Sequence, residues 1–306
     1  MTGQAPAPAR PFDAYPGLFH AADAAAVVLQ RRHFFWEGVL LALTPVSAAA
    51  VLGVALGLIQ LQGAMLTAVS TSLIVLLLWV VRASRWQAQW YACRGLAEDV
   101  KRATWRYVMA LDPFPPGAAD PDAAFVRRLH DAVREQPDVL RSLGERDAAP
   151  TPPVTEEMRR LREAGPAERD VMYRASRLRP ESAWYSRKAR GHLAEDRAWF
   201  VVLVTVQAIA VIVAIILAVQ VRAGGEASPV ADSLVPLLSA VGVAVMGWQR
   251  SRRYGDLAIS YSSTAQELAG LESDHPDPSD EAAYLRWLER VEATLAQEHE
   301  AWRHMT

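Results

Sequence analysis

Cysteine, lysine and catalytic signature motifs are scarce or absent in this 306-residue sequence. Its one cysteine, Cys93, excludes an internal disulfide and a cysteine-rich metal cluster. Lysine occurs only at Lys101 and Lys188, and the net charge of −2 gives no bulk basic character that would favour a nucleic-acid partner. The sequence contains no phosphate-binding loop, G-x-G-x-x-G, H-E-x-x-H or C-x-x-C motif. We therefore expect no enzyme, no cofactor and no metal site.

Charged residues are missing from long stretches of the chain, and this pattern is typical of membrane spans. Residues 38–81 carry no charge, which is enough for two helices of about 20 residues each, and the polar residues 60–63 divide them. Residues 199–221 are uncharged, and the shorter uncharged run 233–248 follows a Gly/Pro turn. We predict spans at about 38–59, 64–81, 199–221 and 233–248, in two hairpins. For the last span, a buried helix of a soluble domain is the alternative.

Arginine and tryptophan gather at one end of the predicted spans. The turns within the two hairpins contain Arg222 as their single basic residue, whereas arginines flank the opposite ends, and the positive-inside rule places those ends in the cytoplasm. Tryptophan favours the headgroup layer. We therefore predict a bacterial inner-membrane protein with both termini in the cytoplasm and the lipid bilayer as its partner. The predicted interface anchors are Trp36, Trp79, Trp199, Trp248, Arg82, Arg85, Arg250 and Arg253.

The interior of the predicted spans is only mildly polar. No acidic, basic or histidine side chain lies at mid-membrane, which argues against a proton pump or an ion-coupled transporter. The candidate residues for lining a conduit are Ser70, Thr71, Ser72 and Gln207. The alternative is that the hydroxyls bond back to their own helix. A stripe of small residues in the first span would favour close helix packing, either between the helices of one hairpin or between subunits. It consists of Ala49, Gly53 and Gly57.

An internal repeat with an offset of 168 residues links the stretches that follow the second and fourth spans. It aligns Arg82 with Arg250 and Arg85 with Arg253. The apolar pairs that follow are spaced four and three apart, as on one face of a helix, so we expect each hairpin to continue as a helix out of the membrane. These pairs are Trp86 with Tyr254, Trp90 with Ala258, Cys93 with Tyr261, Ala97 with Ala265 and Val100 with Leu268.

The rest of the chain is also predicted to be helical, so the expected fold is all-α: four transmembrane helices with long cytosolic stalks and a cytosolic helical bundle. We expect a disordered tail at 1–14 and two modules, 15–165 and 166–306. A short helix is predicted at 121–136, another begins at a cap formed by Thr151 or Thr155, and the last covers 281–304. An aromatic–arginine cluster points to cation–π packing or, alternatively, to binding of a nucleotide base. Its members are Tyr173, Arg177, Trp184 and Tyr185.

The order of several short motifs resembles the SLATT domains, the SMODS- and SLOG-associating two-transmembrane effectors. Residues 15–23, 30–32 and the helix after the second span are similar to a type-three domain. Later residues are similar to a type-one domain. The residues that carry the resemblance are Trp90, Ala97, Glu98, Lys101, Thr104, Trp105, Arg106 and Tyr107 in the first, and Met158, Arg162, Arg169, Tyr173, Arg177, Trp184, Tyr185, Lys188, Ala189, Tyr261, Glu267, Leu268, Glu298, His299 and Trp302 in the second.

This resemblance implies a role in bacterial conflict systems such as anti-phage defence. A partner that makes or senses a nucleotide would activate the protein, which would form a homo-oligomeric pore or otherwise disrupt the membrane. Two alternatives stay open from the residues alone. One is a membrane scaffold whose stalks recruit cytosolic partners, and the other is a housekeeping channel.

Overall fold

The structure is a computed structural model that describes residues 12–59, 61–136, 139, 152–225 and 229–304, and all regular elements in these ranges are helices. Residues 1–11 of the predicted tail lie outside them. The chain forms two compact units. The polar unit comprises Met1–Gln30, Gln87–Ala189 and Ile259–Thr306, and the apolar unit comprises Arg31–Trp86 and Arg190–Ala258. Each sequence module therefore contributes to both units.

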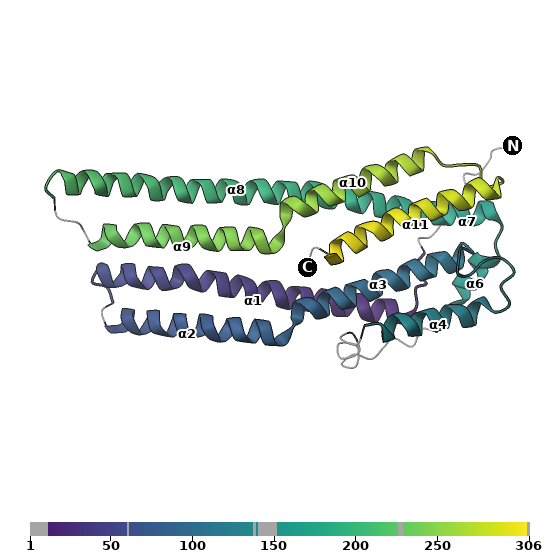
Figure 1. The fold of residues 1–306 in the computed structure, drawn as a ribbon, viewed down its shortest axis with the longest axis horizontal. Helices are drawn as coiled ribbons and strands as arrows, with labels where there is room; N and C mark the ends of the chain where they lie inside the picture. Colours follow the sequence, from purple (N-terminus) through teal and green to yellow (C-terminus); the bar gives the residue numbers. More distant parts are fainter. Residues whose placement is uncertain (1–11, 60, 137–138, 140–151, 226–228, 305–306) are drawn as a thin grey trace, which may run out of the picture. The chain divides into compact units, whose positions relative to one another are not determined.

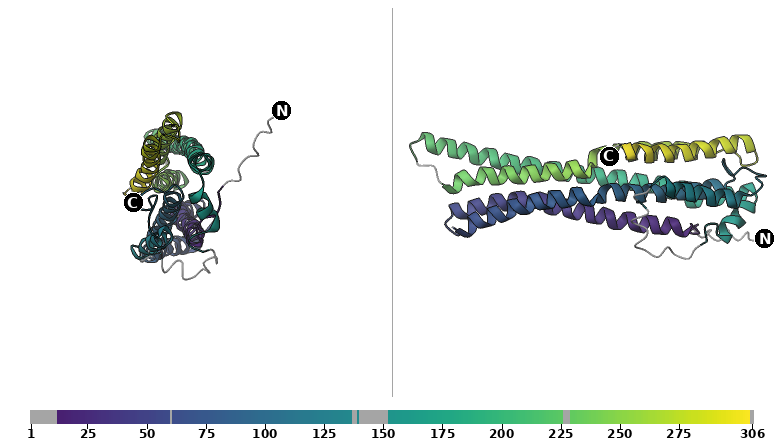
Figure 2. Two further views of the ribbon diagram at one scale, coloured as in Figure 1. Left: turned by 90° about the vertical axis from the view of Figure 1, so that its right-hand side faces the viewer. Right: turned by 60° about the horizontal axis from the view of Figure 1, so that its bottom comes forward.

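The apolar unit is built from two helical hairpins. Helix α1 (Gly17–Ala55) precedes α2 (Leu61–Ser84), and α8 (Arg179–Arg222) precedes α9 (Pro229–Arg252). Within this unit the four helices run side by side (Figures 1 and 2). Large apolar side chains cover the outside: Leu61 is 74% exposed, Val75 63% and Val219 62%. Soluble monomers rarely expose so much contiguous apolar surface.

Four helical stretches are long and apolar enough to cross a membrane. They lie within Gly17–Ala55, Leu61–Val108, Pro166–Arg222 and Asp232–Ser273, with mean hydropathies of 2.1, 2.3, 3.0 and 1.2 over 18 residues. At most 11% of each stretch is buried within the chain, so its apolar surface faces outward. The prediction of four long apolar helices is confirmed, and the fourth, predicted to be the weakest, has the lowest hydropathy.

Glycine in the left-handed conformation ends the first helix of each hairpin. Gly57 has φ +69°, and Gly224 has φ +81°. In the first hairpin, the amides of Gly57 and Leu58 donate to the carbonyls of Val54 and Gly53. This pairing is a Schellman motif, which satisfies carbonyls at a helix end. Helix α1 therefore ends at Ala55 rather than continuing to the predicted end of the span at 59.

A second pair of breaks follows the hairpins. Helix α2 is separated from α3 (Trp86–Val108) by Arg85, and α9 is separated from α10 (Tyr254–Ser273) by Arg253. Both arginines have positive φ, 51° and 49°. A helix follows each hairpin, as expected, but it starts anew after a single left-handed residue, which interrupts the α-helix.

The apolar face predicted beyond these breaks is confirmed. All eight residues of the last four aligned pairs are buried: Trp90, Ala258, Cys93, Tyr261, Ala97, Ala265, Val100 and Leu268. Because the two segments bury the same positions, the internal repeat extends to their packing.

The polar unit adds several shorter helices around an aromatic core. These are α4 (Pro121–Arg134), α6 (Glu156–Glu163), α7 (Pro166–Tyr173) and α11 (Glu281–His304). Asp120 caps α4 by accepting from the Ala123 amide at 2.8 Å, and Thr155 caps α6. Thr151, the other cap considered, lies outside the described residues. The largest fully buried side chains of the core are Trp105, Trp287, Tyr107, Tyr173, Phe114 and Phe125.

Candidate functional site

The predicted conduit residues do not form one polar surface within a single chain. Ser70 is buried, and its hydroxyl donates to the Thr67 carbonyl of its own helix at 3.0 Å. Thr71 and Ser72 are exposed on other sides of the same turn. The Gln207 amide lies over Gly242 of α9, where a Cβ would come within 2.8 Å of its Oε1. Helix geometry explains the division, because consecutive residues point about 100° apart.

Glycine allows close packing at positions other than the predicted stripe. A Cβ on Gly63 would overlap Val54 Cγ2 and lie 3.5 Å from the Ala50 carbonyl, so α1 and α2 approach closely there. A Cβ on Gly247 would lie 2.7 Å from Leu41 Cδ2, where α9 meets α1. The structure places Ala49 on an exposed surface, Gly53 against Ile59, and Gly57 in the turn after α1.

The predicted interface anchors lie where the apolar stretches of α1, α2, α8 and α9 meet their arginine-rich flanks, and we call this part of the apolar unit the basic end. Trp79 is 68% exposed, and Trp36 stacks on Trp86 with ring centroids 6.5 Å apart. Trp248 packs on Gly38 and lies 6.3 Å from the Phe34 ring. Arg82 and Arg250 are exposed, Trp199 is half-buried, and Arg253 pairs with Asp256 at 3.1 Å.

A buried ion pair joins α11 to a π-helical turn, η1 (Arg174–Leu178), in the polar unit. Arg177 and Glu292 are 3% and 1% exposed. The guanidinium donates to both oxygens of Glu292, at 3.1 and 3.2 Å, and the Tyr173 hydroxyl donates to Oε1 at 2.8 Å. Arg177 also pairs with Glu181, which Lys101 contacts in turn. A charged pair this deeply buried depends on its hydrogen bonds, because desolvation opposes it.

This network shifts the pKa values of its members. Burial by itself lowers the pKa of Arg177, but the carboxylates of Glu292 and Glu181 outweigh burial, so its pKa is raised. Burial and the Glu292 charge raise the pKa of Tyr173. Burial also raises the pKa of Tyr15, to about 12, against the opposing charge of Arg177. Because the pKa values of Arg177, Tyr173 and Tyr15 are raised, these three groups stay protonated at neutral pH, which points to a structural role.

The predicted aromatic–arginine cluster is divided between two places in the polar unit. Tyr173 and Arg177 belong to the buried ion pair, where carboxylates rather than rings hold the guanidinium. Trp184 and Tyr185 pack on Tyr261, with ring centroids 5.4 and 5.6 Å apart, and Lys188 lies 5.9 Å above the Trp184 ring. The cation–π packing expected for the cluster therefore involves Lys188 and Trp184.

Sequence reasoning missed a second buried carboxylate, Asp170, which is 4% exposed. Its Oδ1 accepts from the Tyr284 hydroxyl at 3.2 Å and lies 2.8 Å from His275 Nε2. Arg174 approaches Oδ2 at 3.5 Å. The -Asp-Pro- loop around His275 gave no signal for this contact, because the partners are about a hundred residues apart in sequence.

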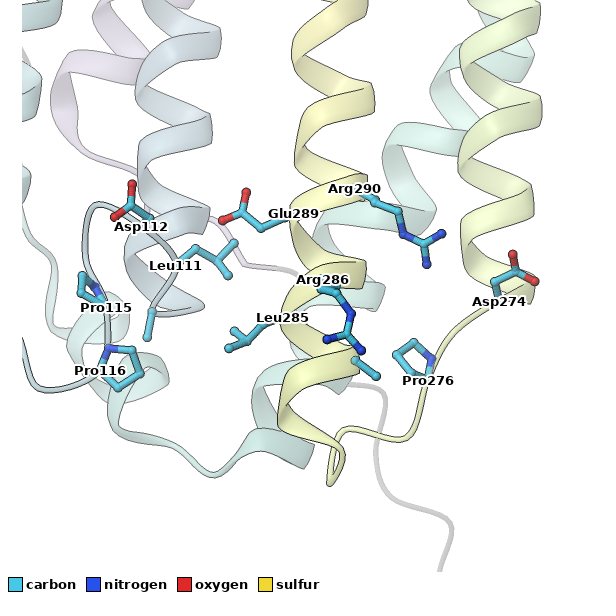
Figure 3. Close-up of a pocket in the computed structure, with 12 residues that line it drawn as sticks. Leu111, Asp112, Pro115, Pro116, Asp274, Pro276, Leu285, Arg286, Glu289 and Arg290 are labelled. Atoms are coloured by element: carbon cyan, nitrogen blue, oxygen red, sulfur yellow. The ribbon is translucent and has the colours of Figure 1, made fainter.

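A pocket of about 710 Å³ lies in the polar unit beside α11 (Figure 3). Leu111, Pro115 and Pro116 line one side, and Arg286 and Arg290 face the loop with Asp274 and Pro276 on the other. Glu289 is engaged by Arg106 through two hydrogen bonds of 2.9 and 2.7 Å. Among the described residues, the lining of this pocket contains no histidine, cysteine or hydroxyl side chain. Within the described residues no group of three or more metal-ligating side chains occurs.

Comparison with protein-family models gives two matches that together cover most of the chain. Residues 16–170 match SMODS and SLOG-associating 2TM effector domain 3, and residues 173–302 match SMODS and SLOG-associating 2TM effector domain 1. The chain belongs to this family of effector domains, and the predicted order of the two types is confirmed. No curated protein and no solved structure matched the chain.

Proposed function

We propose that the chain is a membrane effector of a bacterial anti-phage defence system, which oligomerises and breaches the inner membrane when activated. The observation that carries the proposal is the apolar unit, whose four outward-facing apolar helices occur in a chain built from two 2TM effector domains. In lipid, these exposed side chains no longer carry the free-energy cost of hydration. Catalysis has no part in this proposal.

The proposed topology places the basic end and both termini in the cytoplasm. Residues 56–59, after α1, carry no charge, whereas arginines crowd the basic end. Positively charged flanks are retained on the cytoplasmic side during insertion. The polar unit, including the pocket beside α11, then lies in the cytoplasm, where a nucleotide-synthesising or nucleotide-sensing partner protein can reach it.

The proposed pore needs several chains. Within one chain Ser70 is bonded to its own helix and Gln207 covers Gly242, so the polar groups of one apolar unit do not enclose a path. Thr71 and Ser72 are exposed and are therefore available to face a conduit between subunits. Association of apolar units would also explain small residues on the lipid-facing side, such as Ala49.

The test is membrane potential in cells that carry the chain with its activating partner. We expect depolarisation on activation, with Thr71→Leu and Ser72→Leu reducing it while membrane insertion is kept. Val75→Leu is the matched control, because Val75 is 63% exposed and stays apolar. An unchanged membrane potential on activation would contradict the proposal.

A membrane scaffold is the second candidate, and the pocket beside α11 favours it. That pocket presents Arg286, Arg290 and several prolines at the surface of the polar unit, as a docking surface for a partner would. If the scaffold is correct, Arg286→Glu abolishes partner binding, whereas leucine substitutions at Thr71 and Ser72 leave activity intact. Partner-dependent activity without depolarisation would distinguish it from a pore.

A further inference from the structure

An aromatic box surrounds the guanidinium of Arg252 at the basic end of the apolar unit. Its carbon lies 4.1 Å from the Phe34 ring centroid on α1, 5.4 Å from that of Trp248 and 5.5 Å from that of Tyr254. Nε donates to the Tyr254 hydroxyl at 3.2 Å. Rings from both hairpins thus hold one cation in a fixed place, and cation–π contacts are strongest when desolvated.

The cation in this box has no carboxylate partner in the part of the chain that the structure describes. Among the described residues, no acidic side chain comes within 4 Å of Arg252, although Arg253 beside it pairs with Asp256. Glu37 lies on the adjacent turn of α1, with its Oε2 3.2 Å from His33 Nε2. The two terminal nitrogens of Arg252 therefore keep their hydrogens for an acceptor from outside the chain.

A second unused donor lies in the same box. The Trp248 indole Nε1 is buried, and no acceptor within the described part of the chain reaches it. A buried N–H without a partner costs about 1–3 kcal/mol, and most buried polar atoms do have one. Trp248 and Arg252 are one helical turn apart on α9, and the guanidinium carbon lies 5.4 Å from the Trp248 ring centroid, so the two donor groups are close enough for one ligand.

The surroundings of the box are apolar. Phe35 is 62% exposed, Met246 45% and Val243 55%, all within a few residues of the box on α1 and α9. A ligand that bonds to the two donors therefore lies against surface suited to acyl chains rather than to water. The ligand that fits this site is therefore an oxyanion attached to a hydrocarbon chain, at the place where an apolar span meets its basic flank.

We infer that Arg252 and Trp248 form a binding site for the phosphate of an anionic phospholipid, here represented by phosphatidylglycerol. A guanidinium donates to phosphate oxygens through charge-assisted hydrogen bonds, and the indole N–H adds a third donor. The inference rests on the proposed membrane location of the apolar unit. By engaging α9 while Phe34 of α1 packs on the same guanidinium, the lipid holds the two hairpins together.

The test uses the full-length protein purified in detergent, with lipid adducts counted by native mass spectrometry. We expect phosphatidylglycerol to bind about tenfold more tightly than phosphatidylcholine, and Trp248→Phe, which removes the indole N–H but keeps an aromatic ring, to weaken binding about tenfold. Arg252→Gln should remove the preference. Trp79→Phe and Arg250→Gln are matched controls, since Trp79 is exposed and Arg250 lies outside the box, and both should bind as the parent does.

Equal binding by the parent and by Trp248→Phe, with unchanged melting temperatures, would overturn the inference. Displacement of the lipid by millimolar inorganic phosphate would also overturn it, because the site would then hold a free anion. Failure of the membrane proposal gives a separate result: the protein would stay soluble without detergent and would not enter vesicles of any composition.

Discussion

Arg85 and Arg253 occupy the same position in two copies of one motif, 168 residues apart, and both have left-handed backbones with φ of 51° and 49°. Each joins a helix of the apolar unit to the helix that follows it. A left-handed conformation is unfavourable for a side chain with a Cβ, by about 1–2 kcal/mol. Its occurrence twice at aligned positions shows that the repeat extends to a strained backbone conformation.

Glycine at these two positions is expected to stabilise the protein. Arg85→Gly and Arg253→Gly remove the Cβ that opposes positive φ. We expect each to raise the free energy of unfolding by about 0.5–1 kcal/mol, because the higher conformational entropy of glycine in the unfolded chain offsets part of the gain. The Arg253–Asp256 pair that is lost is largely exposed and contributes little. Thermal unfolding in detergent measures the effect. Arg82→Gly, within α2, serves as the control and should lose about 1 kcal/mol.

Breaking the buried ion pair is expected to destabilise the polar unit strongly. Glu292→Gln removes a negative charge that faces the buried guanidinium of Arg177. We expect the free energy of unfolding to fall by about 3 kcal/mol. Denaturant unfolding of the full-length protein measures it. Glu289→Gln on the same helix removes a more exposed pair with Arg106 and should cost under about 1 kcal/mol. Similar losses for the two variants would contradict a special role for Glu292.

Alanine at Gly63 is expected to separate α1 from α2. The added Cβ overlaps Val54 Cγ2, and a valine in a helix has few other rotamers, so we expect a loss of about 1–3 kcal/mol. Gly191→Ala is the control: nothing lies within 4 Å of its Cβ, and it should gain about 0.5–1 kcal/mol. Combining Gly63→Ala with Val54→Ala should recover most of the loss. Melting temperatures in detergent test all three.

The contribution of Asp122 to stability is expected to disappear in acid. Burial alone raises the pKa of Asp122, but hydrogen bonds from Tyr107 and Arg159 outweigh it, and the pKa lies below its usual value of 3.8. Such a carboxyl stabilises the fold at pH values above its unfolded pKa, and this stabilisation is lost as the pH falls through the folded pKa. The melting-temperature difference between the parent and Asp122→Asn should therefore be constant near neutrality and shrink below about pH 4. Asp131→Asn, which changes an exposed aspartate on the same helix, is the matched control.

Extended hydrophobic patterns in the sequence predicted much of the fold. The uncharged runs predicted the four long apolar helices, and the repeated four-and-three spacing predicted which faces of α3 and α10 are buried. Both depend on hydrophobicity summed over many residues, which tolerates local exceptions. Gly57 was assigned to the packing stripe, although it ends the first helix with positive φ, and arginine at 85 and 253 gave no signal because this residue type does not favour positive φ.

Individual polar contacts could not be predicted from the sequence. Glu292 on α11 is a charged residue of a type that usually faces solvent. It is nevertheless 1% exposed, because Arg177 and Tyr173 lie against it. Arg252 is one of the arginines that flank the predicted spans, but its aromatic box needs Phe34 from more than two hundred residues earlier. Such contacts depend on how helices pack against one another, and a single sequence does not reveal this packing.

The wide turn η1 has a consequence for how this chain tolerates changes in length. The Arg179 amide bonds back five residues to the Arg174 carbonyl, so the turn holds one residue more than an α-helix would. Deleting a single amino acid here would restore ordinary winding, leave the flanking helices nearly in line, and change the angle of the residues inside the turn around the helix axis. Arg177 would then swing away from Glu292, although every side chain of the pair would still be present. The spacing of the chain at this point is therefore as necessary to that contact as the two charges are.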